Sequence, residues 1–269
     1  MTSGNISSKV NSLKRSDNRN PRLAPSADGS DNRNPRLAPS ADSSGNRKPR
    51  LAPSADKIKP NRSSLNRSDR DLVKNCKAII FDCDGTLVDS MPVHFVAWHE
   101  TMQRYGIVFA EERFYSLGGV PSDRIIELLA GEQGITLDAI AVAHEKEQAF
   151  LDRIDMLVPI RAVVEVVRQN RGVKPIAVAS GGFRAIIQKQ LQQIARHDWF
   201  DAVVTAEDTF KHKPEPDVFL EAARRLGTAP SHCVVFEDAD LGVEAARRAG
   251  MHCIDVRTFH TPQRIPIGT

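Results

Sequence analysis

The 269-residue sequence has few of the features that mark a secreted or membrane-bound protein. It contains only four cysteines, which form neither a CxxC pair nor a dense pattern, so a disulfide scaffold is excluded. No apolar run approaches the roughly 20 residues of a membrane-spanning helix. The N-terminus also lacks the apolar core of a secretory signal. We therefore expect a cytoplasmic protein without membrane contacts.

Aromatic residues are scarce as well, and none occurs in the first 75 residues. That stretch carries 16 Lys and Arg against 7 Asp and Glu, whereas the remainder carries 21 against 27. It also holds three near-identical 14-residue blocks, which begin at Asp17, Asp31 and Gly45. Each block has one leucine and two prolines, too little apolar surface to offset the entropy lost on ordering the chain. We interpret residues 1–75 as a disordered basic leader.

Two interpretations of this leader stay open. Its positive charge could attract nucleic acid or an acidic membrane. However, arginines alternate with aspartates, and no aromatic side chain is interleaved with them. A repetitive DNA element translated into a tolerated extension, or a start codon placed too far upstream, explains the repeats without any partner. We favour this second interpretation and expect no nucleic-acid partner.

Short apolar runs recur from Cys76 onward and indicate buried strands. An unbroken apolar run suits a parallel sheet that is covered on both faces. Helical patterns lie between the later runs, which favours right-handed crossovers between parallel strands. The predicted strands are residues 78–81, 176–179, 202–204, 233–236 and 253–256.

Residues 91–157 interrupt this alternation with helical patterns and no convincing strand. A helical insertion directly after the first strand would form a cap over the carboxyl edge of the sheet. There it could exclude water and select a substrate. We therefore predict an α/β fold with a sheet core at 76–90 and 158–260, a helical cap at 91–157 and a tail at 261–269.

Polar side chains follow the first two strands, at the edge of a parallel sheet where ligands bind. Asp82 and Asp84 come directly after the first strand, and two carboxylates this close repel each other unless a cation or proton is shared. The second strand ends at Ser180, which precedes two glycines and a helix. A hydroxyl and backbone N–H groups at the start of a helix suit a phosphate.

The third and fourth strands add a lysine and two more carboxylates. Lys213 stands before a proline and the next helix, where it could pair with a phosphate or with Asp82; Glu237 and Asp238 end the fourth strand. Each feature alone has an ordinary explanation, such as a solvated turn, a loop, a helix start or a helix cap. Their occurrence at four successive strand ends favours one site. Its hard oxygen ligands favour magnesium over zinc.

This pattern resembles the haloacid dehalogenase superfamily of aspartyl phosphotransferases. DCDGT, ASGG, KHKP and FEDAD match its four motifs in order, within residues 76–257. The segments DGTLVDSMPVHFVAWHETM and CVVFEDADLGVEAARRAGM resemble its β-phosphoglucomutase-like branch. Within that branch they are most similar to bacterial sugar phosphatases that hydrolyse fructose 1-phosphate. The resemblance implies a Rossmann-like core with an inserted cap, a small sugar phosphate as substrate and a monomeric enzyme.

The resemblance also implies a role for each motif residue. Asp82 would attack phosphorus and form an aspartyl-phosphate. Asp84 would protonate the leaving oxygen and then activate water. The remaining roles are binding: Ser180, the Gly181 N–H and Lys213 would hold the phosphoryl oxygens, and Asp82, the Asp84 carbonyl, Glu237 and Asp238 would hold Mg²⁺.

Four residues of the predicted cap follow from the resemblance. His94 matches a histidine at the cap hinge and Lys146 a cap lysine, while Gly119 and Val120 match the substrate loop of the mutases. Without the resemblance, a lone histidine on an amphipathic helix is more simply interpreted as packed or solvated.

The sequence departs from the mutases in that substrate loop. The mutases place an arginine there to hold a second phosphate, whereas the aligned residue is Ser122, although Arg124 could replace it. We therefore favour a Mg²⁺-dependent phosphatase of fructose 1-phosphate or a related hexose phosphate, acting through an aspartyl-phosphate. The alternative is a β-phosphoglucomutase, which interconverts β-glucose 1-phosphate and glucose 6-phosphate. A third hypothesis is a catalytically idle domain that the leader tethers to nucleic acid.

Overall fold

The computed structural model describes residues 64–194 and 197–267. Their five strands form one parallel sheet in the order β3-β2-β1-β4-β5. Each observed strand end lies within one residue of its predicted position. None of the helices described is long and apolar enough to cross a bilayer. The strands are β1 (Ala78–Phe81), β2 (Ile176–Ala179), β3 (Ala202–Val204), β4 (Cys233–Glu237) and β5 (His252–Asp255).

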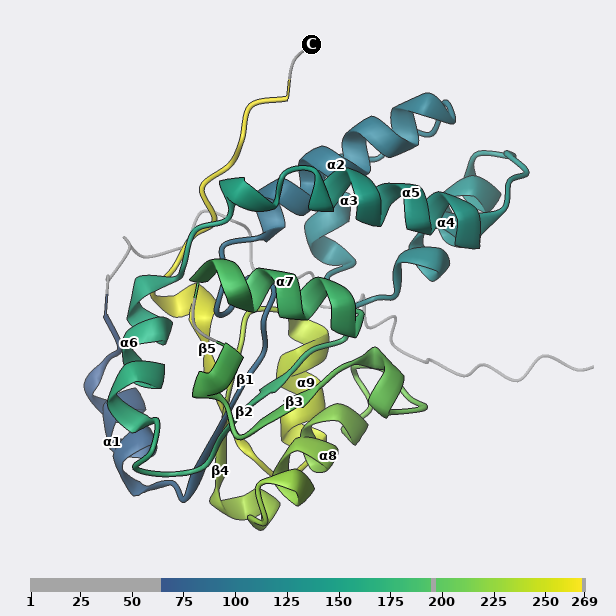
Figure 1. Cartoon of the computed structure of the whole chain (residues 1–269). Coiled ribbons are helices and arrows are strands. Elements are labelled where there is room, and N and C mark those ends of the chain that lie inside the picture. Colours follow the sequence, from purple (N-terminus) through teal and green to yellow (C-terminus); the bar gives the residue numbers. More distant parts are fainter. Residues whose placement is uncertain (1–63, 195–196, 268–269) are drawn as a thin grey trace, which may run out of the picture. The chain divides into compact units, whose positions relative to one another are not determined.

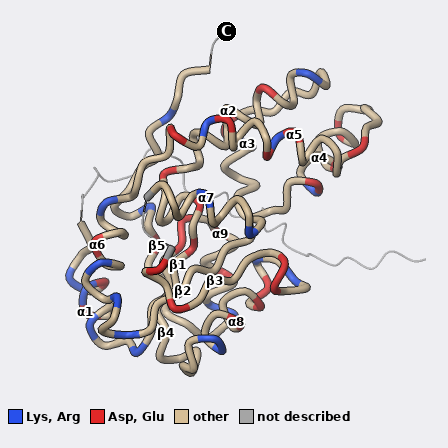
Figure 2. Tube along the Cα trace, in the orientation of Figure 1, with Lys and Arg blue, Asp and Glu red and all other residues tan. Residues whose placement is uncertain are grey.

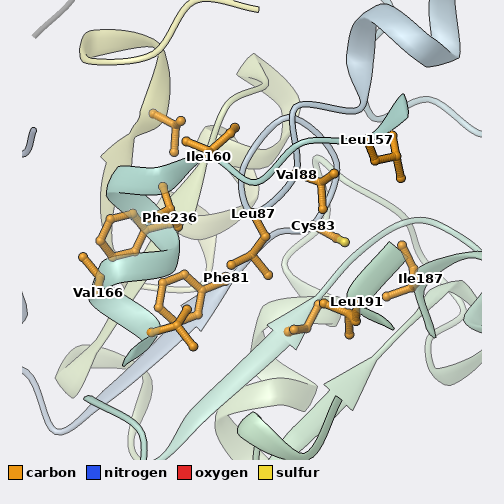
Figure 3. Packing of buried hydrophobic residues seen from close by; sticks show 14 of the residues in the cluster. Phe81, Cys83, Leu87, Val88, Leu157, Ile160, Val166, Ile187, Leu191 and Phe236 are labelled. Atoms are coloured by element: carbon orange, nitrogen blue, oxygen red, sulfur yellow. The ribbon is translucent and has the colours of Figure 1, made fainter. Parts of the chain in front are cut away.

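Helices cover both faces of the sheet (Figure 1), and side chains of β1 alternate between the two faces. Ile79 and Phe81 belong to one hydrophobic cluster, and Ala78 and Ile80 to another. In Figure 3, Phe81 lies near Phe236 of β4, and the two rings stack with centroids 5.1 Å apart. The first face is covered by α6 (Arg161–Asn170) and α7 (Arg184–Ile194), and the second by α8 (Asp217–Arg225) and α9 (Asp240–Arg248).

Four helices inserted between β1 and α6 form a layer that we call the cap helices. They share a third hydrophobic cluster, which includes Phe95, Trp98, Met102 and Ile126. Figure 1 shows them on one side of the sheet. The predicted fold class, an α/β core with a helical cap after the first strand, is confirmed, while the domain boundaries stay a prediction. The cap helices are α2 (Met91–Arg104), α3 (Glu111–Ser116), α4 (Ser122–Glu132) and α5 (Ala139–Leu151).

The prediction that the leader is disordered up to residue 75 is wrong at its C-terminal end. A helix, α1 (Arg67–Asn75), precedes the sheet. Leu65 is buried in the core, and Leu72 of α1 packs against the same cluster. These two leucines are enough to hold the segment in place, because they pack against an apolar face that the sheet and α6 already provide. Residues 1–63, which include the three repeats, lie outside the described residues.

Helices α3 and α6 were not among the predicted elements, although the buried Val163, Val167 and Asn170 of α6 have the spacing of an amphipathic helix. At the start of α9, Ala239 holds the N-cap position, and no side chain caps the helix. The Asp238 carboxylate instead accepts a hydrogen bond from Thr86 Oγ1 at 3.1 Å. Gly250 follows the end of α9 with φ +72°.

After β5 the chain returns to the cap helices. The Gln263 N–H donates to Asp89, in the linker between β1 and α2, at 3.1 Å. Arg264 pairs with Glu111 of α3 at 3.1 Å. Ile267 packs against the hydrophobic cluster of the cap helices. The C-terminal segment therefore contacts both the linker and the cap.

Candidate active site

One cavity of about 450 Å³ lies between the carboxyl ends of the strands and the cap helices. Acidic residues gather beside β1 (Figure 2). The structure brings every residue that the sequence predicts for the site to this cavity, although their chemical roles stay predictions. These lining residues are Asp82, Asp84, His94, Gly119, Val120, Lys146, Ser180, Gly181, Lys213, Glu237 and Asp238.

A buried lysine joins two carboxylates at the floor of the cavity. Phe81 of β1 pairs in register with Phe236 of β4, so the residues that follow them, Asp82 and Glu237, lie side by side. Lys213 Nζ lies 2.6 Å from Asp82 Oδ1 and 2.7 Å from Glu237 Oε2. Burial opposes the charge of Lys213, but the two carboxylates outweigh burial and raise the pKa of Lys213 above its ordinary value. The site therefore has a fixed positive charge beside Asp82.

Asp82, Glu237 and Asp238 form a group suited to a divalent cation. Each presents an oxygen within 4.8 Å of the others. Burial, followed by repulsion from Glu237, raises the pKa of both Asp82 and Asp238 well above the usual range. A cation would relieve this repulsion, and an all-oxygen donor set fits Mg²⁺.

Within this group Glu237 is the most engaged carboxylate. Its Oε1 accepts hydrogen bonds from the N–H groups of Asp238 at 3.2 Å and Ala239 at 3.0 Å, while its Oε2 faces Lys213. Asp82 and Asp238 therefore keep the freer oxygens for a metal.

Two glycines give these carboxylates room. A Cβ placed on Gly85, whose φ is +74°, would lie 2.0 Å from Asp238 Oδ2. A Cβ on Gly242 of α9 would lie 2.1 Å from Glu237 Cδ. Sequence reasoning missed the role of Gly242, because a helical pattern does not distinguish it from a tolerated glycine.

Asp84 Oδ1 accepts three hydrogen bonds. The donors are Ser90 Oγ at 2.6 Å, His94 Nε2 at 2.9 Å and Gln190 Nε2 at 2.9 Å. Burial would raise the pKa of Asp84, but His94 and these hydrogen bonds together hold it well below its usual range. The arrangement favours the ionised carboxylate. Sequence reasoning missed Ser90 and Gln190.

A buried network continues from Asp84 into the cap helices. Lys146 Nζ lies 3.0 Å from His94 Nδ1 and 3.0 Å from Glu147 Oε1. Because an ammonium group can only donate, we assign Nδ1 of His94 as the acceptor, so that Nε2 carries the proton facing Asp84. The His94 ring also stacks on Phe150, with centroids 3.8 Å apart. His94 is thus held from three sides.

Ser180, Gly181 and Gly182 also line the cavity, at the end of β2. Ser180 is buried at the end of β2, and its Oγ accepts the Gly182 N–H at 3.1 Å. Gly119 and Val120 approach from the turn between α3 and α4, where Gly119 has φ +87°. The predicted phosphate residues and the predicted substrate loop therefore face one cavity from its two sides.

Comparisons with known proteins agree with this geometry. The sequence matches the haloacid dehalogenase-like hydrolases over residues 76–250. It is 41% identical to the fructose-1-phosphate phosphatase YqaB of Escherichia coli (strain K12) over 180 residues, 66% of this chain and 95% of that protein. It is 30% identical to the β-phosphoglucomutase of Bacillus subtilis (strain 168) over 190 residues, 67% of this chain and 83% of that one. A solved hydrolase from Pseudomonas syringae is similar with a TM-score of 0.60 and 25% identity, covering 69% of this chain and 87% of its own.

Proposed function

Because the chain belongs to the haloacid dehalogenase-like hydrolase family, as its motifs predicted, we propose that it is a Mg²⁺-dependent phosphatase of small sugar phosphates. The observation that carries the proposal is the buried Asp82 carboxylate, which faces a cavity beside Lys213 and two further carboxylates. The relative that hydrolyses fructose 1-phosphate supports that compound, or a related hexose phosphate, as substrate.

In the proposed reaction an oxygen of Asp82 attacks phosphorus. The bond between phosphorus and the sugar oxygen breaks, and Asp84 gives that oxygen a proton. Water then attacks the aspartyl-phosphate and loses a proton to Asp84, which frees inorganic phosphate and restores Asp82. The phosphoryl oxygens are held by Lys213, the Ser180 hydroxyl and the Gly181 N–H.

The metal would be held by the carboxylates of Asp82, Glu237 and Asp238 and the carbonyl of Asp84. When bound, Mg²⁺ neutralises charge between the nucleophile and the phosphate. Burial and its acidic neighbours raise the pKa of Asp82, which opposes the ionised form that acts as the nucleophile. A cation bound beside Asp82 would favour that form, as the ion pair with Lys213 does.

The contacts of Asp84 favour its role in the second step, the hydrolysis of the aspartyl-phosphate. Its three hydrogen-bond donors favour the ionised form, which can accept a proton from water. To protonate the leaving oxygen first, Asp84 has to bind a proton and exchange at least one of these donors for the substrate. Contacts with His94, Ser90 and Gln190 therefore set how readily the first half proceeds.

The cavity lining supports a phosphatase over a β-phosphoglucomutase. Ser122 occupies the position where the mutases have their arginine. Arg124, which could have replaced it, is exposed and pairs with Glu127 at 2.7 Å. Among the residues that the structure describes, no arginine lines the cavity. The described lining therefore has no guanidinium group that could bind a second phosphate through paired hydrogen bonds.

A phosphate-release screen with the purified full chain tests the proposal. The substrates are fructose 1-phosphate, glucose 1- and 6-phosphates and 6-phosphogluconate, with MgCl₂ or with EDTA. We expect Mg²⁺-dependent release from at least one of them and its loss in Asp82→Asn. Supplying β-glucose 1-phosphate with a glucose 1,6-bisphosphate primer tests the alternative, since glucose 6-phosphate formed without free phosphate would establish a mutase.

We also propose that the enzyme acts as a monomer in the cytoplasm. Its four cysteines are free thiols, which suits a reducing compartment. Light scattering on the purified chain checks the first point, where a mass near the 29.7 kDa of one chain is expected.

A further inference from the structure

Glu147 is one of the charged side chains that line the cavity without a part in the proposed chemistry. Glu147 lies on α5, and its side chain is 15% exposed. Ile140, His144 and Glu147 are spaced by four and three residues, so they share one face of the helix. All three line the cavity. The carboxylate of Glu147 is therefore presented to whatever occupies the cavity.

Two neighbours hold one oxygen of Glu147 and leave the other free. Oε1 accepts hydrogen bonds from Lys146 Nζ and from Ser122 Oγ, both at 3.0 Å. Across residues 64–194 and 197–267, Oε2 has no hydrogen-bond partner, and it is not sealed from solvent. Burial would raise the pKa of Glu147, but attraction to Lys146 outweighs it and lowers the pKa. The free oxygen thus belongs to a charged carboxylate held in place.

Glu147 belongs to the cap side of the cavity and does not contact Asp84, the proposed acid and base. Three hydrogen-bonded steps separate it from Asp84, through His94 and Lys146. Glu147 therefore faces the part of a substrate that extends from the phosphate toward the cap helices.

Among the described residues, the charges around Glu147 leave no unpaired lysine for a second anion. Two lysines line the cavity in the described part of the chain. Lys146 is neutralised by Glu147, and Lys213 is neutralised by Asp82 and Glu237. Asp123, next to Ser122, adds another carboxylate to the lining and pairs with the exposed Arg124 at 3.8 Å. Within residues 64–194 and 197–267, the cap side of the cavity therefore offers no unpaired lysine or arginine to a second anionic group.

We propose that Glu147 selects the substrate by accepting hydrogen bonds from sugar hydroxyl groups and repelling a second anionic group. A hydroxyl donates readily to a carboxylate oxygen, whereas two like charges in a partly buried site repel strongly. This inference rests on the proposed phosphatase function and defines its substrate class. The class is monophosphates of polyhydroxylated carbon chains with an uncharged far end, which excludes bisphosphates and phosphorylated sugar acids such as 6-phosphogluconate.

The test is the ratio of kcat/KM for fructose 1-phosphate to kcat/KM for fructose 1,6-bisphosphate. If the screen favours another hexose phosphate, the same ratio is measured for it and its bisphosphate. Glu147→Gln keeps the shape of the side chain and removes its charge. We expect the ratio to fall at least tenfold, because hydrogen bonds to a charged acceptor are stronger than those to a neutral one and the repulsion is lost. The loss on the monophosphate should appear mainly in KM.

Glu145→Gln is the matched control. Glu145 lies on the same helix but is exposed, pairs with Arg104 and Tyr105, and does not line the cavity. We expect its ratio to stay within twofold of the wild type. An equal fall in both variants would mean that total charge, and not the position of Glu147, sets the selectivity, and would overturn the proposal.

A wild-type ratio in a folded Glu147→Gln variant also overturns it. If circular dichroism shows that this variant does not fold, Ser122→Ala replaces it, since it removes one of the two donors that hold Oε1. We expect the ratio to fall about threefold in Ser122→Ala. An unchanged ratio would contradict the assignment. A wild type that releases no phosphate from any monophosphate contradicts the proposed function itself, which separates the two failures.

Discussion

Lys213 Nζ lies 2.6 Å from Asp82 Oδ1, although 131 positions separate the two residues in the chain. The contact forms because both residues follow strands of one parallel sheet, and the carboxyl ends of such strands meet at the same edge. Lys213 also binds Glu237, so a single ammonium group balances two buried carboxylates.

Lys213→Met should therefore lower both turnover and stability. The substitution leaves Asp82 and Glu237 buried without their cation, and breaking a buried ion pair in this way costs about 3 kcal/mol of unfolding free energy. We expect turnover to fall at least about a hundredfold, since a donor to the transferring phosphoryl group is lost. Urea unfolding and phosphate release measure the two effects. Lys211→Met, two residues away and exposed, should change neither; an unaltered unfolding midpoint for Lys213→Met would contradict the pairing.

Gly242→Ala should displace Glu237 without removing any charged group. The added methyl would lie 2.1 Å from Glu237 Cδ, so the buried carboxylate has to move. We expect turnover to fall at least about tenfold and stability to fall by about 1–3 kcal/mol, as for overpacked sites. Gly131→Ala in α4 is the control, because nothing lies within 4 Å of its added methyl. That variant should be as stable as the wild type or more stable by up to about 1 kcal/mol, since alanine favours helix.

Asp208 should make stability depend on pH in the acid range. Burial opposes its charge, but hydrogen bonds from Arg225 and Thr205 outweigh burial and lower the pKa of Asp208 from 3.8 to about 2. A folded-state pKa below the unfolded value means that the contribution is complete above about pH 4 and disappears as the pH falls toward 2. Thermal unfolding of Asp208→Asn beside the wild type checks this. The difference in Tm should be largest above pH 4 and should narrow below it; a constant difference from pH 6 to 2.5 would refute the assignment.

The helix before the sheet should contribute measurably to the core. A shortened chain that begins at Cys76 loses α1 and the buried Leu65, whereas one that begins at Ser64 retains both. We expect the shorter version to be less stable by about 3 kcal/mol, the usual effect of removing a buried leucine. Urea unfolding of the two versions measures the difference. Equal midpoints would show that these contacts add nothing.

The residues that the sequence revealed are those with a local pattern. Each strand is an apolar run, and each strand end carries a polar group, so the positions of Asp82, Ser180 and Lys213 could be predicted before their contacts were known. Parallel strands then require these residues to meet. The same argument covers Glu237 and Asp238.

The residues that the sequence did not reveal depend on distant partners or on context. Gln190 lies 106 positions from Asp84 and is one of four glutamines in α7, so no motif marks it. Glu147 is one of several charged residues on α5, and only its contacts separate it from Glu145. The helix α1 was missed because its apolar residues are few, although Asn66, which accepts a hydrogen bond from the Asp69 N–H at 2.9 Å, gave a capping signal.

The cap helices have a hydrophobic cluster of their own, which holds all the buried residues of α4, whereas α2 and α5 also add side chains to one of the clusters that flank the sheet. A change in α4 can therefore alter the cap side of the cavity while the packing around the sheet is kept.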